Sequence, residues 1–159
     1  MTEVKEVKKE GTVPLPPVLF LSCLVAGGLL QLYRPFDFVL TSFVSRLLCA
    51  LVLFGGAVLL IASALLPMQR AGTTHHPTGT PSALITSGPF RFSRNPLYVS
   101  LLLMLAGFAA LLNSVWLLLT MPVLFLLLNG FVIPREEAVL GRLFGEEYTA
   151  YRGRVRRWL

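Results

Sequence analysis

The segment 88–98, Gly-Pro-Phe-Arg-Phe-Ser-Arg-Asn-Pro-Leu-Tyr, leads without a spacer into the sixteen apolar residues 97–112. It places two arginines, an amide and aromatic rings where an apolar helix emerges into water. Proline is favoured in the first turn of a helix, where its missing N–H would have no intrahelical partner, so Pro96 predicts a helix start. The side chain of Asn95 is expected to accept a hydrogen bond from the first free amides. The pattern indicates a functional site at a membrane interface.

The composition excludes an ordinary soluble domain. The 159 residues are 55% hydrophobic and 14% charged, with a mean hydropathy of +0.71. The net charge is +6, and the charges cluster outside the apolar segments. This favours orientation signals and lipid headgroup contacts, and no nucleic-acid partner is expected. Cys23 and Cys49 stand in apolar segments without other ligands beside them, so we expect buried small hydrophobes.

Four apolar segments are candidate membrane spans, although the third, 97–112, reaches only about 24 Å as a helix and either includes the motif residues in its first turn or stops short of the far headgroups. A helix rises 1.5 Å per residue and the hydrocarbon core is about 30 Å thick, so roughly 20 residues suffice. The link between the last two segments has two residues, Asn113 and Ser114, and so short a link joins antiparallel neighbours. We therefore expect an all-α integral membrane protein with four transmembrane helices, the last two forming a helical hairpin. The segments are 14–33, a second one that ends at Leu66 before Pro67, 97–112 and 115–133.

Single residues within these segments lead to further expectations. The pairs Gly27-Gly28 and Gly55-Gly56 would let neighbouring helices approach closely. Pro122 is expected to kink the fourth helix. Arg46 either snorkels to the outer interface from the start of the second span or lies inside the bundle as a functional charge.

After Pro134 the sequence becomes amphipathic, with apolar residues at helical spacing and charges on the other face. We expect a cytoplasmic amphipathic C-terminal helix along the membrane surface, with Trp158 as an interfacial anchor. Its apolar positions are Leu140, Leu143, Phe144, Tyr148 and Tyr151.

Basic residues predict the orientation. All of the fourteen lysines and arginines except Arg34 and Arg46 lie in the N-terminal arm, the 67–96 loop and the tail. With four spans these three segments share one side of the membrane, and the positive-inside rule places that side in the cytoplasm. We expect the plasma (inner) membrane, with both termini cytoplasmic.

The chain thus divides into three regions. A mobile charged arm covers 1–13, two N-terminal transmembrane helices cover 14–66, and the loop, hairpin and tail cover 67–159. His75 and His76 in the loop are adjacent, point opposite ways in an extended chain and have no Cys or acid beside them. No metal site is therefore expected.

On the cytoplasmic side, the loop and the tail bring acids, arginines, an amide and aromatic rings to the mouth of an apolar bundle. Such a set suits a zwitterionic cofactor that carries an adenosine. The alternative is structural, with glutamates that cap the tail helix and arginines that bind lipid phosphates. The residues considered are Glu136 or Glu137 for ribose hydroxyls or an ammonium, Arg91 or Arg94 for a carboxylate, and Phe90 or Tyr98 for an adenine or a sulfonium.

Three motifs stand out within 82–155. They are Leu84-Ile85-Thr86-Ser87-Gly88-Pro89-Phe90-Arg91, then Arg94-Asn95-Pro96-Leu97-Tyr98, then Glu136-Glu137 followed by Leu140 and Phe144-Gly145-Glu146-Glu147-Tyr148 with Tyr151. Together they resemble the membrane methyltransferase family that includes isoprenylcysteine carboxyl methyltransferases and, more distantly, phospholipid N-methyltransferases.

The resemblance implies an S-adenosylmethionine-dependent methyltransferase, with the cofactor between the cytoplasmic end of the hairpin and the tail. The region 67–159 would then be catalytic. The implied catalytic residues are Arg135 and Glu137, and the implied cofactor-binding residues are Ser82, Ala83, Leu84, Ile85, Phe90, Arg94, Asn95, Pro96, Leu97, Tyr98, Glu136 and Tyr148.

The chain departs from the isoprenylcysteine enzymes at two positions. Asn95 stands where those enzymes have histidine, although both side chains can donate one hydrogen bond. Val132, four residues before Glu136, stands where they have an arginine that binds the substrate carboxylate. Arg135 is close but one face away on a helix. We therefore expect a small lipophilic or lipid acceptor that presents an amine, thiol or hydroxyl.

Two other functions stay open at the level of the sequence. A membrane sterol-type reductase resembles the C-terminal hairpin, but its NADPH would require basic residues clustered for the 2′-phosphate. A non-catalytic membrane subunit is the third possibility.

Overall fold

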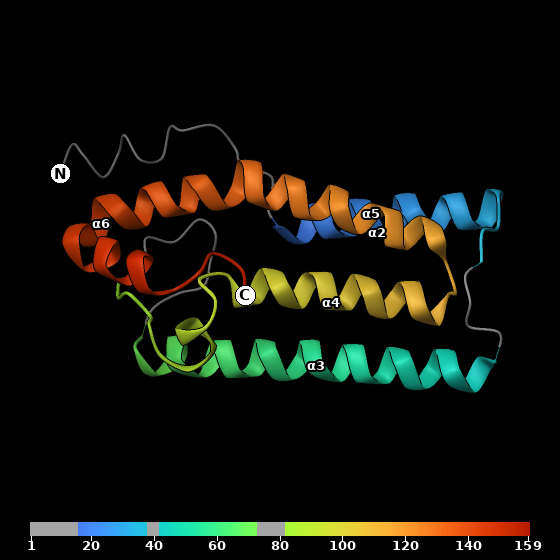
Figure 1. The fold of residues 1–159 in the computed structure, drawn as a ribbon, viewed down its shortest axis with the longest axis horizontal. Helices are drawn as coiled ribbons and strands as arrows, with labels where there is room; N and C mark the ends of the chain where they lie inside the picture. Colours follow the sequence, from blue (N-terminus) through green and yellow to red (C-terminus); the bar gives the residue numbers. More distant parts are fainter. Residues whose placement is uncertain (1–15, 38–41, 73–81) are drawn as a thin grey trace.

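The computed structural model describes residues 16–37, 42–72 and 82–159. This part of the chain is helical and contains no strands, which confirms the all-α class. Figure 1 shows the long helices α2 to α5 side by side in one elongated bundle, with α6 projecting at one end. The arm 1–13, His75 and His76 lie outside the described residues. The elements are α2 (Pro16–Tyr33), α3 (Phe43–Arg70), the 3-10 turn η2 (Gly88–Arg91), α4 (Pro96–Leu111), α5 (Val115–Leu127), the π-helical η3 (Leu128–Val132) and α6 (Ile133–Arg154).

Three helical stretches are long and apolar enough to cross a membrane: Pro16–Tyr33, Phe43–Arg70 and the continuous stretch Val115–Arg154. The fourth apolar helix, α4, has only 16 residues. It starts at Pro96 as predicted, and it forms the predicted hairpin with α5 across Asn113 and Ser114. The count of four spans stays a prediction.

The predicted end of the second span at Pro67 is wrong, because α3 continues to Arg70. A proline near the end of a helix removes only one hydrogen bond, here the one that would reach the Ser63 carbonyl. Gly88, with a φ of 61°, lies directly on this region. A Cβ at Gly88 would lie 3.3 Å from the Ser63 oxygen. The 88–98 segment therefore sits on α3 through a position that favours glycine.

The fourth span and the tail form one helical stretch. Pro134 does not interrupt it, because it lies in the first turn of α6, where a missing N–H is tolerated. The departure from α-helical geometry lies in η3, while α5 is continuous through Pro122. At Gly145, where φ is 49°, α6 turns back toward the bundle (Figure 1). This turn divides the predicted amphipathic face, and Leu143 is 45% exposed.

Small residues set the closest helix contacts. Ala50, Ala57 and Ala64 of α3 recur at seven-residue spacing, and each is at most 1% exposed where α3 packs on α4. Gly107 of α4 faces the ring of Phe54, and a Cβ there would lie 2.6 Å from it. Small side chains let apolar helices approach closely without a hydrophobic driving force between them.

The glycine pairs behave differently from the prediction. Gly27 packs on Leu117 of α5 as expected, and a Cβ on it would lie 2.6 Å from that side chain. Gly28, Gly55 and Gly56 have no described atom within 4 Å of such a Cβ. The expected close contact at Gly55-Gly56 is wrong, because the pair lies away from the alanine stripe that faces α4.

The end opposite α6 is closed by polar contacts between distant segments. Gln31 at the end of α2 donates to Asp37 at 2.8 Å and accepts from the Ser114 hydroxyl at 2.9 Å. Ser114 also accepts from the amide of Leu117 and so caps α5. Arg46 lies half-buried in the first turn of α3.

We predict that Gly107→Ala destabilises the bundle and Gly56→Ala does not. The added methyl at Gly107 would overlap the Phe54 ring, and overpacking of this kind costs about 1–3 kcal/mol. At Gly56 the methyl has open space, and alanine favours the helix more than glycine does. Thermal unfolding in detergent micelles measures both variants. Equal midpoints would contradict the packing described for α3 and α4.

Candidate active site

The first turns of α4 and α6 meet at one end of the bundle, and residues 155–159 return to lie beside them (Figure 1). The Arg94 amide donates to the Arg156 carbonyl at 3.0 Å, and Ser93 and Arg156 form a parallel bridge. Three segments far apart in the sequence therefore enclose one group of polar side chains.

Tyr98 and Glu136 form the first contact of this group. The Tyr98 hydroxyl donates to Glu136 Oε1 at 2.5 Å. Burial raises the pKa of Glu136, the hydrogen bond from Tyr98 lowers it, and the neighbouring charge of Glu137 raises it further, with a net upward direction. Glu136 is thus a desolvated carboxyl group beyond the apolar part of its helix, held by a tyrosine of α4.

Glu137 lies between two guanidinium groups. Its Oε1 is 2.9 Å from Arg94 Nη1, and its Oε2 accepts from Arg157 Nη2 at 2.6 Å. Arg157 Nε also donates to Oε1, at 3.2 Å. The side chains of Glu137 and Arg94 are each 10% exposed. Ion pairs with so little water around them are much stronger than surface pairs, provided that the partners satisfy each other.

The C-terminal residues attach to the π-helix and to the start of α4. Arg157 Nη1 and Trp158 Nε1 both donate to Asn129 Oδ1, at 3.3 Å and 3.0 Å. The Asn95 side chain donates to the Arg157 carbonyl at 2.9 Å. The expected capping bond from Asn95 is therefore wrong, since its side chain faces the tail instead of the first amides of α4.

Two tyrosines of α6 face the 88–98 segment after the turn at Gly145. The Tyr151 hydroxyl donates to the Phe90 carbonyl at 2.8 Å, and Arg94 Nη1 makes a long hydrogen bond of 3.5 Å to the Tyr148 hydroxyl. Burial raises the pKa of Tyr151 to about 12, so it stays a neutral donor. A Cβ at Gly145 would meet nothing within 4 Å, so the glycine serves the backbone turn.

The structure pairs five of the predicted site residues with one another: Tyr98 bonds Glu136, and Arg94 bonds both Glu137 and Tyr148. Asn95 and Phe90 are bonded at the same end, to the Arg157 carbonyl and to the Tyr151 hydroxyl. Pro96 is buried, and Ala83, Leu84, Ile85 and Leu97 are half-buried.

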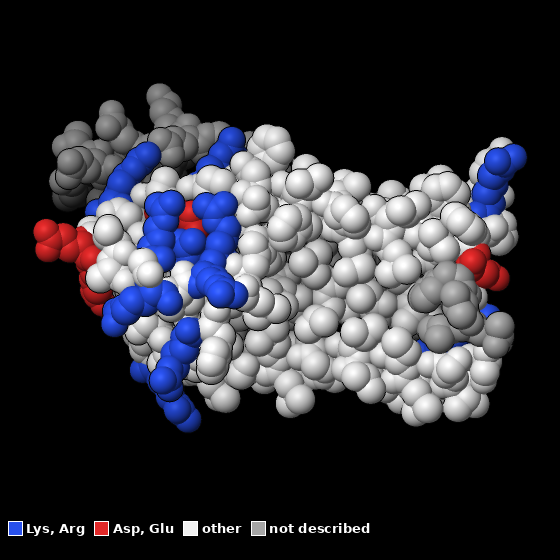
Figure 2. Space-filling model, in the orientation of Figure 1, with Lys and Arg blue, Asp and Glu red and all other residues white. Residues whose placement is uncertain are grey.

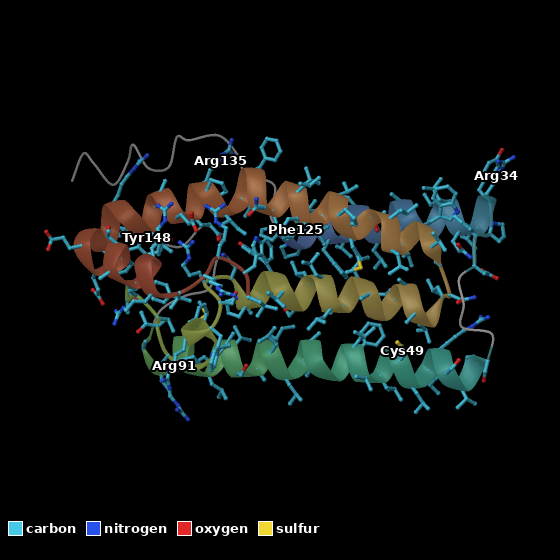
Figure 3. The ribbon with its side chains drawn as sticks, in the orientation of Figure 1. Arg34, Cys49, Arg91, Phe125, Arg135 and Tyr148 are labelled. Atoms are coloured by element: carbon cyan, nitrogen blue, oxygen red, sulfur yellow. The ribbon has the colours of Figure 1, made fainter. Side chains whose placement is uncertain are left out.

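Two predicted residues lie apart from this group. Ser82 is exposed and its hydroxyl donates to the Gly72 carbonyl at 3.4 Å. Arg135 is exposed, and Figure 3 shows it on the outer side of α6, pointing away from the bundle. Val132 is 1% exposed and belongs to the apolar core.

Sequence reasoning missed the roles of Arg157, Trp158 and Asn129. It treated Trp158 as an interfacial anchor and counted Arg157 only among the basic residues of the tail, because no periodicity connects positions 20 to 29 residues apart. The one available signal was Asn129, a polar side chain inside an apolar segment, since such groups require a hydrogen-bond partner.

The arrangement has unused hydrogen-bonding capacity. Arg94 Nε is buried and has no hydrogen-bond partner in the described residues. Glu136 uses one oxygen for Tyr98, and its other oxygen accepts no hydrogen bond from the described part of the chain. A buried donor without an acceptor costs about 1–3 kcal/mol. The group is therefore suited to a ligand that carries both an anionic and a hydrogen-bond-donating part.

The fold and the site define a helical membrane protein with a charged, aromatic-lined group at the polar end of its bundle. The sequence profile of the phospholipid methyltransferase family matches residues 45–147, and the chain belongs to this family. It is also similar to an uncharacterised protein of Haemophilus influenzae, with 41% identity over 63 residues, 40% of this chain and 100% of the relative. No solved structure matches.

We predict that Glu137→Ala destabilises the protein far more than Glu147→Ala. The first change leaves the two arginines without their shared counter-ion, and breaking a buried pair in this way costs about 3 kcal/mol. Glu147 is an exposed residue of the same helix. Denaturant unfolding in micelles compares the two variants, and similar losses of stability would show that Glu137 is not the link between the segments.

Proposed function

We propose that the protein is an S-adenosylmethionine-dependent methyltransferase that acts at the cytoplasmic membrane interface on a small lipophilic acceptor. One observation carries the proposal: Arg94, Tyr98, Glu136 and Glu137 come together at the polar end of an apolar bundle. Membership of the phospholipid methyltransferase family supports the reaction class.

The donors and acceptors of the site fit this cofactor. The buried, unpartnered Arg94 Nε suits the cofactor carboxylate. The second oxygen of Glu136 suits a ribose hydroxyl or the ammonium group. The rings of Phe90 and Tyr148, whose residues are tied to this end of the bundle, are proposed to contact the adenine or the sulfonium. When bound, the cofactor supplies a methyl group on a positively charged sulfur.

The residues of the chain itself would position the reactants and exclude water from the site. Methyl transfer requires the acceptor atom to be held in line with the methyl group in a dry site. Both carboxylate oxygens of Glu137 are paired, one with Arg94 and the other with Arg157. We therefore assign Glu137 a positioning role, in which it fixes the Arg94 guanidinium. Tyr98 fixes Glu136 in the same way. Arg135, which is exposed, would act only after rotation toward the site.

We infer four spans with both termini on the cytoplasmic side of the plasma (inner) membrane. The α6 end carries most of the described basic residues, as Figure 2 shows, whereas Arg34 and Arg46 lie at the opposite end. The positive-inside rule supports this orientation. With 16 residues, α4 spans about 24 Å, so its first turn would lie at the headgroups. The basic residues at the α6 end are Arg70, Arg91, Arg94, Arg135, Arg142, Arg152, Arg154, Arg156 and Arg157.

Cysteine labelling tests the orientation. In a variant with Cys23 and Cys49 replaced by serine, single cysteines at the exposed positions Arg34 and Ala71 are expected to react with an impermeant maleimide from opposite sides of the membrane. Reaction from the same side would overturn the four-span arrangement.

Calorimetry tests the cofactor. Glu136→Ala is expected to weaken S-adenosylmethionine binding by about 1.5–3 kcal/mol, roughly tenfold or more, because a charge-assisted contact is lost. Asn95→Ala should have a smaller effect, since it loosens the tail without removing a cofactor ligand. His75→Ala and His76→Ala serve as controls. Unchanged binding in Glu136→Ala and Asn95→Ala, or binding of NADPH in place of S-adenosylmethionine, would contradict the proposal.

The acceptor is predicted to be an amine, thiol or hydroxyl on an apolar molecule. Val132 is buried in the core, and no Lys or Arg occurs between Trp116 and Pro134. A carboxylate placed there would be desolvated without a partner.

A farnesyl-cysteine analogue should therefore be methylated much more slowly than lipid amines when labelled methyl transfer is measured. Robust methylation of that analogue which disappears in Arg135→Ala would refute this prediction and indicate that Arg135 binds the carboxylate.

A further inference from the structure

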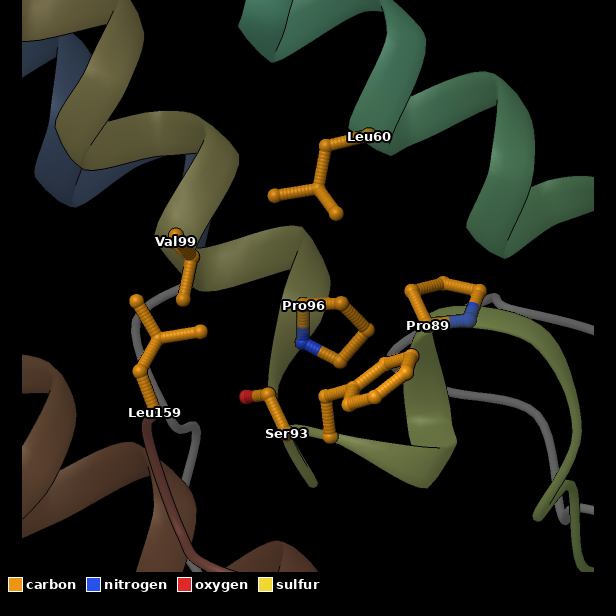
Figure 4. Close-up of a pocket in the computed structure, with 7 residues that line it drawn as sticks. Leu60, Pro89, Ser93, Pro96, Val99 and Leu159 are labelled. Atoms are coloured by element: carbon orange, nitrogen blue, oxygen red, sulfur yellow. The ribbon is translucent and has the colours of Figure 1, made fainter.

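Two hollows adjoin each other beside the tail. The first is an apolar cavity of about 270 Å³ between α3, α4 and the 88–98 segment (Figure 4), where Leu60, Pro89, Pro96 and Val99 surround it. The second, of about 320 Å³, is more open and is lined by three arginines, Arg91, Arg154 and Arg156. Phe92 and Leu159 belong to the walls of both. Together they form one amphipathic depression.

The three arginines have no acidic partner among the described residues. Arg154 Nε donates to the Ala150 carbonyl at 3.2 Å, which leaves its terminal nitrogens available. Figure 3 shows Arg91 pointing away from the bundle. Like charges gathered around one hollow repel each other, and a bound anion offsets that repulsion.

The apolar cavity favours an anion that carries a hydrocarbon chain over a free anion. Phe92 and Leu159 are 73% and 75% exposed, and the cavity between them and Leu60 has an almost entirely apolar lining. Each CH₂ group of a hydrocarbon chain that is buried there adds to the free energy of binding. A ligand with a phosphate and an adjoining hydrocarbon chain would therefore use both hollows, whereas a free phosphate would use only one.

We propose that Arg91, Arg154 and Arg156 bind the phosphate of an anionic phospholipid, and that one of its acyl chains occupies the cavity between α3 and α4. This lipid would be a ligand apart from those of the candidate active site, because neither hollow is lined by Arg94, Tyr98, Glu136 or Glu137. It also bears on the tail. The Arg156 carbonyl accepts from the Arg94 amide, so a lipid held by Arg156 fixes the tail against the candidate active site.

Native mass spectrometry of the full chain in neutral detergent tests the proposal. The probes are phosphatidylglycerol and phosphatidylcholine with identical acyl chains. We expect the parent to retain phosphatidylglycerol about tenfold better, and Arg154→Gln/Arg156→Gln to lose that preference. The matched control is Arg34→Gln/Arg152→Gln, which removes the same charge outside the hollow and should keep it. Equal retention of the two lipids by the parent, or loss of preference in both variants, would overturn the proposal.

A second arm separates a lipid from a free phosphate. Leu60→Trp fills the apolar cavity and should lower phosphatidylglycerol retention severalfold, with Val99→Phe as an independent cavity variant. The unfolding midpoint in phosphatidylcholine micelles confirms that these variants are folded. Inorganic phosphate at millimolar concentration should not displace the lipid. Full displacement, together with unchanged retention in both cavity variants, would show a free-anion site and refute the acyl-chain assignment. S-adenosylmethionine is absent throughout, so the result is independent of the proposed enzyme activity.

Discussion

The carboxylate of Glu137 joins the three segments on which the site depends. Arg94 comes from the segment before α4, Glu137 from near the start of α6, and Arg157 from the C-terminal tail. Glu137 and Arg94 are each 10% exposed and would not be stable alone there, because removing an ion from water costs several kcal/mol unless a partner replaces the solvent. The two arginines and the glutamate are therefore held in one arrangement. Tyr98 and Glu136 lie beside it on the same two helix ends.

Several local features follow from the need to bring the tail back to this carboxylate. Gly145 turns α6 by adopting a positive φ, which places Tyr148 and Tyr151 against the 88–98 segment. The π-helical segment η3 presents Asn129 to the tail, and π-helical insertions of this kind often occur at functional sites. The same arrangement leaves Arg94 Nε buried without a partner, so the network links the segments and still has one unused donor.

The sequence predicted most reliably what depends on local pattern. Runs of apolar residues predicted α2, α4 and α5, and Pro96 and the two-residue link predicted the hairpin bounds. Pro67 misled because a proline near the end of a helix removes only one hydrogen bond and did not stop α3 there. Gly55-Gly56 misled because a glycine pair does not reveal its face, whereas the stripe Ala50, Ala57, Ala64 does.

For the candidate site, the sequence predicted Glu136, Glu137 and the residues of the 94–98 motif. It did not predict that the tail residue Arg157 would contact them. Contacts such as Arg157 with Glu137 and Asn95 with the Arg157 carbonyl join residues 20 and 62 positions apart. No periodicity reports such pairs, because they depend on the single backbone turn at Gly145. Arg135 is adjacent to Glu136 in sequence yet exposed, since neighbours on a helix point about 100° apart.

The short tail serves two environments at once. Arg157 and Trp158 bond to the interior amide of Asn129, while Arg156 and Leu159 line the open hollow. Residues 155–159 can do this because they bend at positions 155 and 157, so that their side chains leave the backbone in several directions. The arginines of the tail require water or counter-charges, and its apolar end requires hydrocarbon. Both requirements are met together at the boundary between the two. The folding of the tail against α4 and α6 is therefore tied to the membrane boundary, and so is the geometry of Glu137 and Arg94.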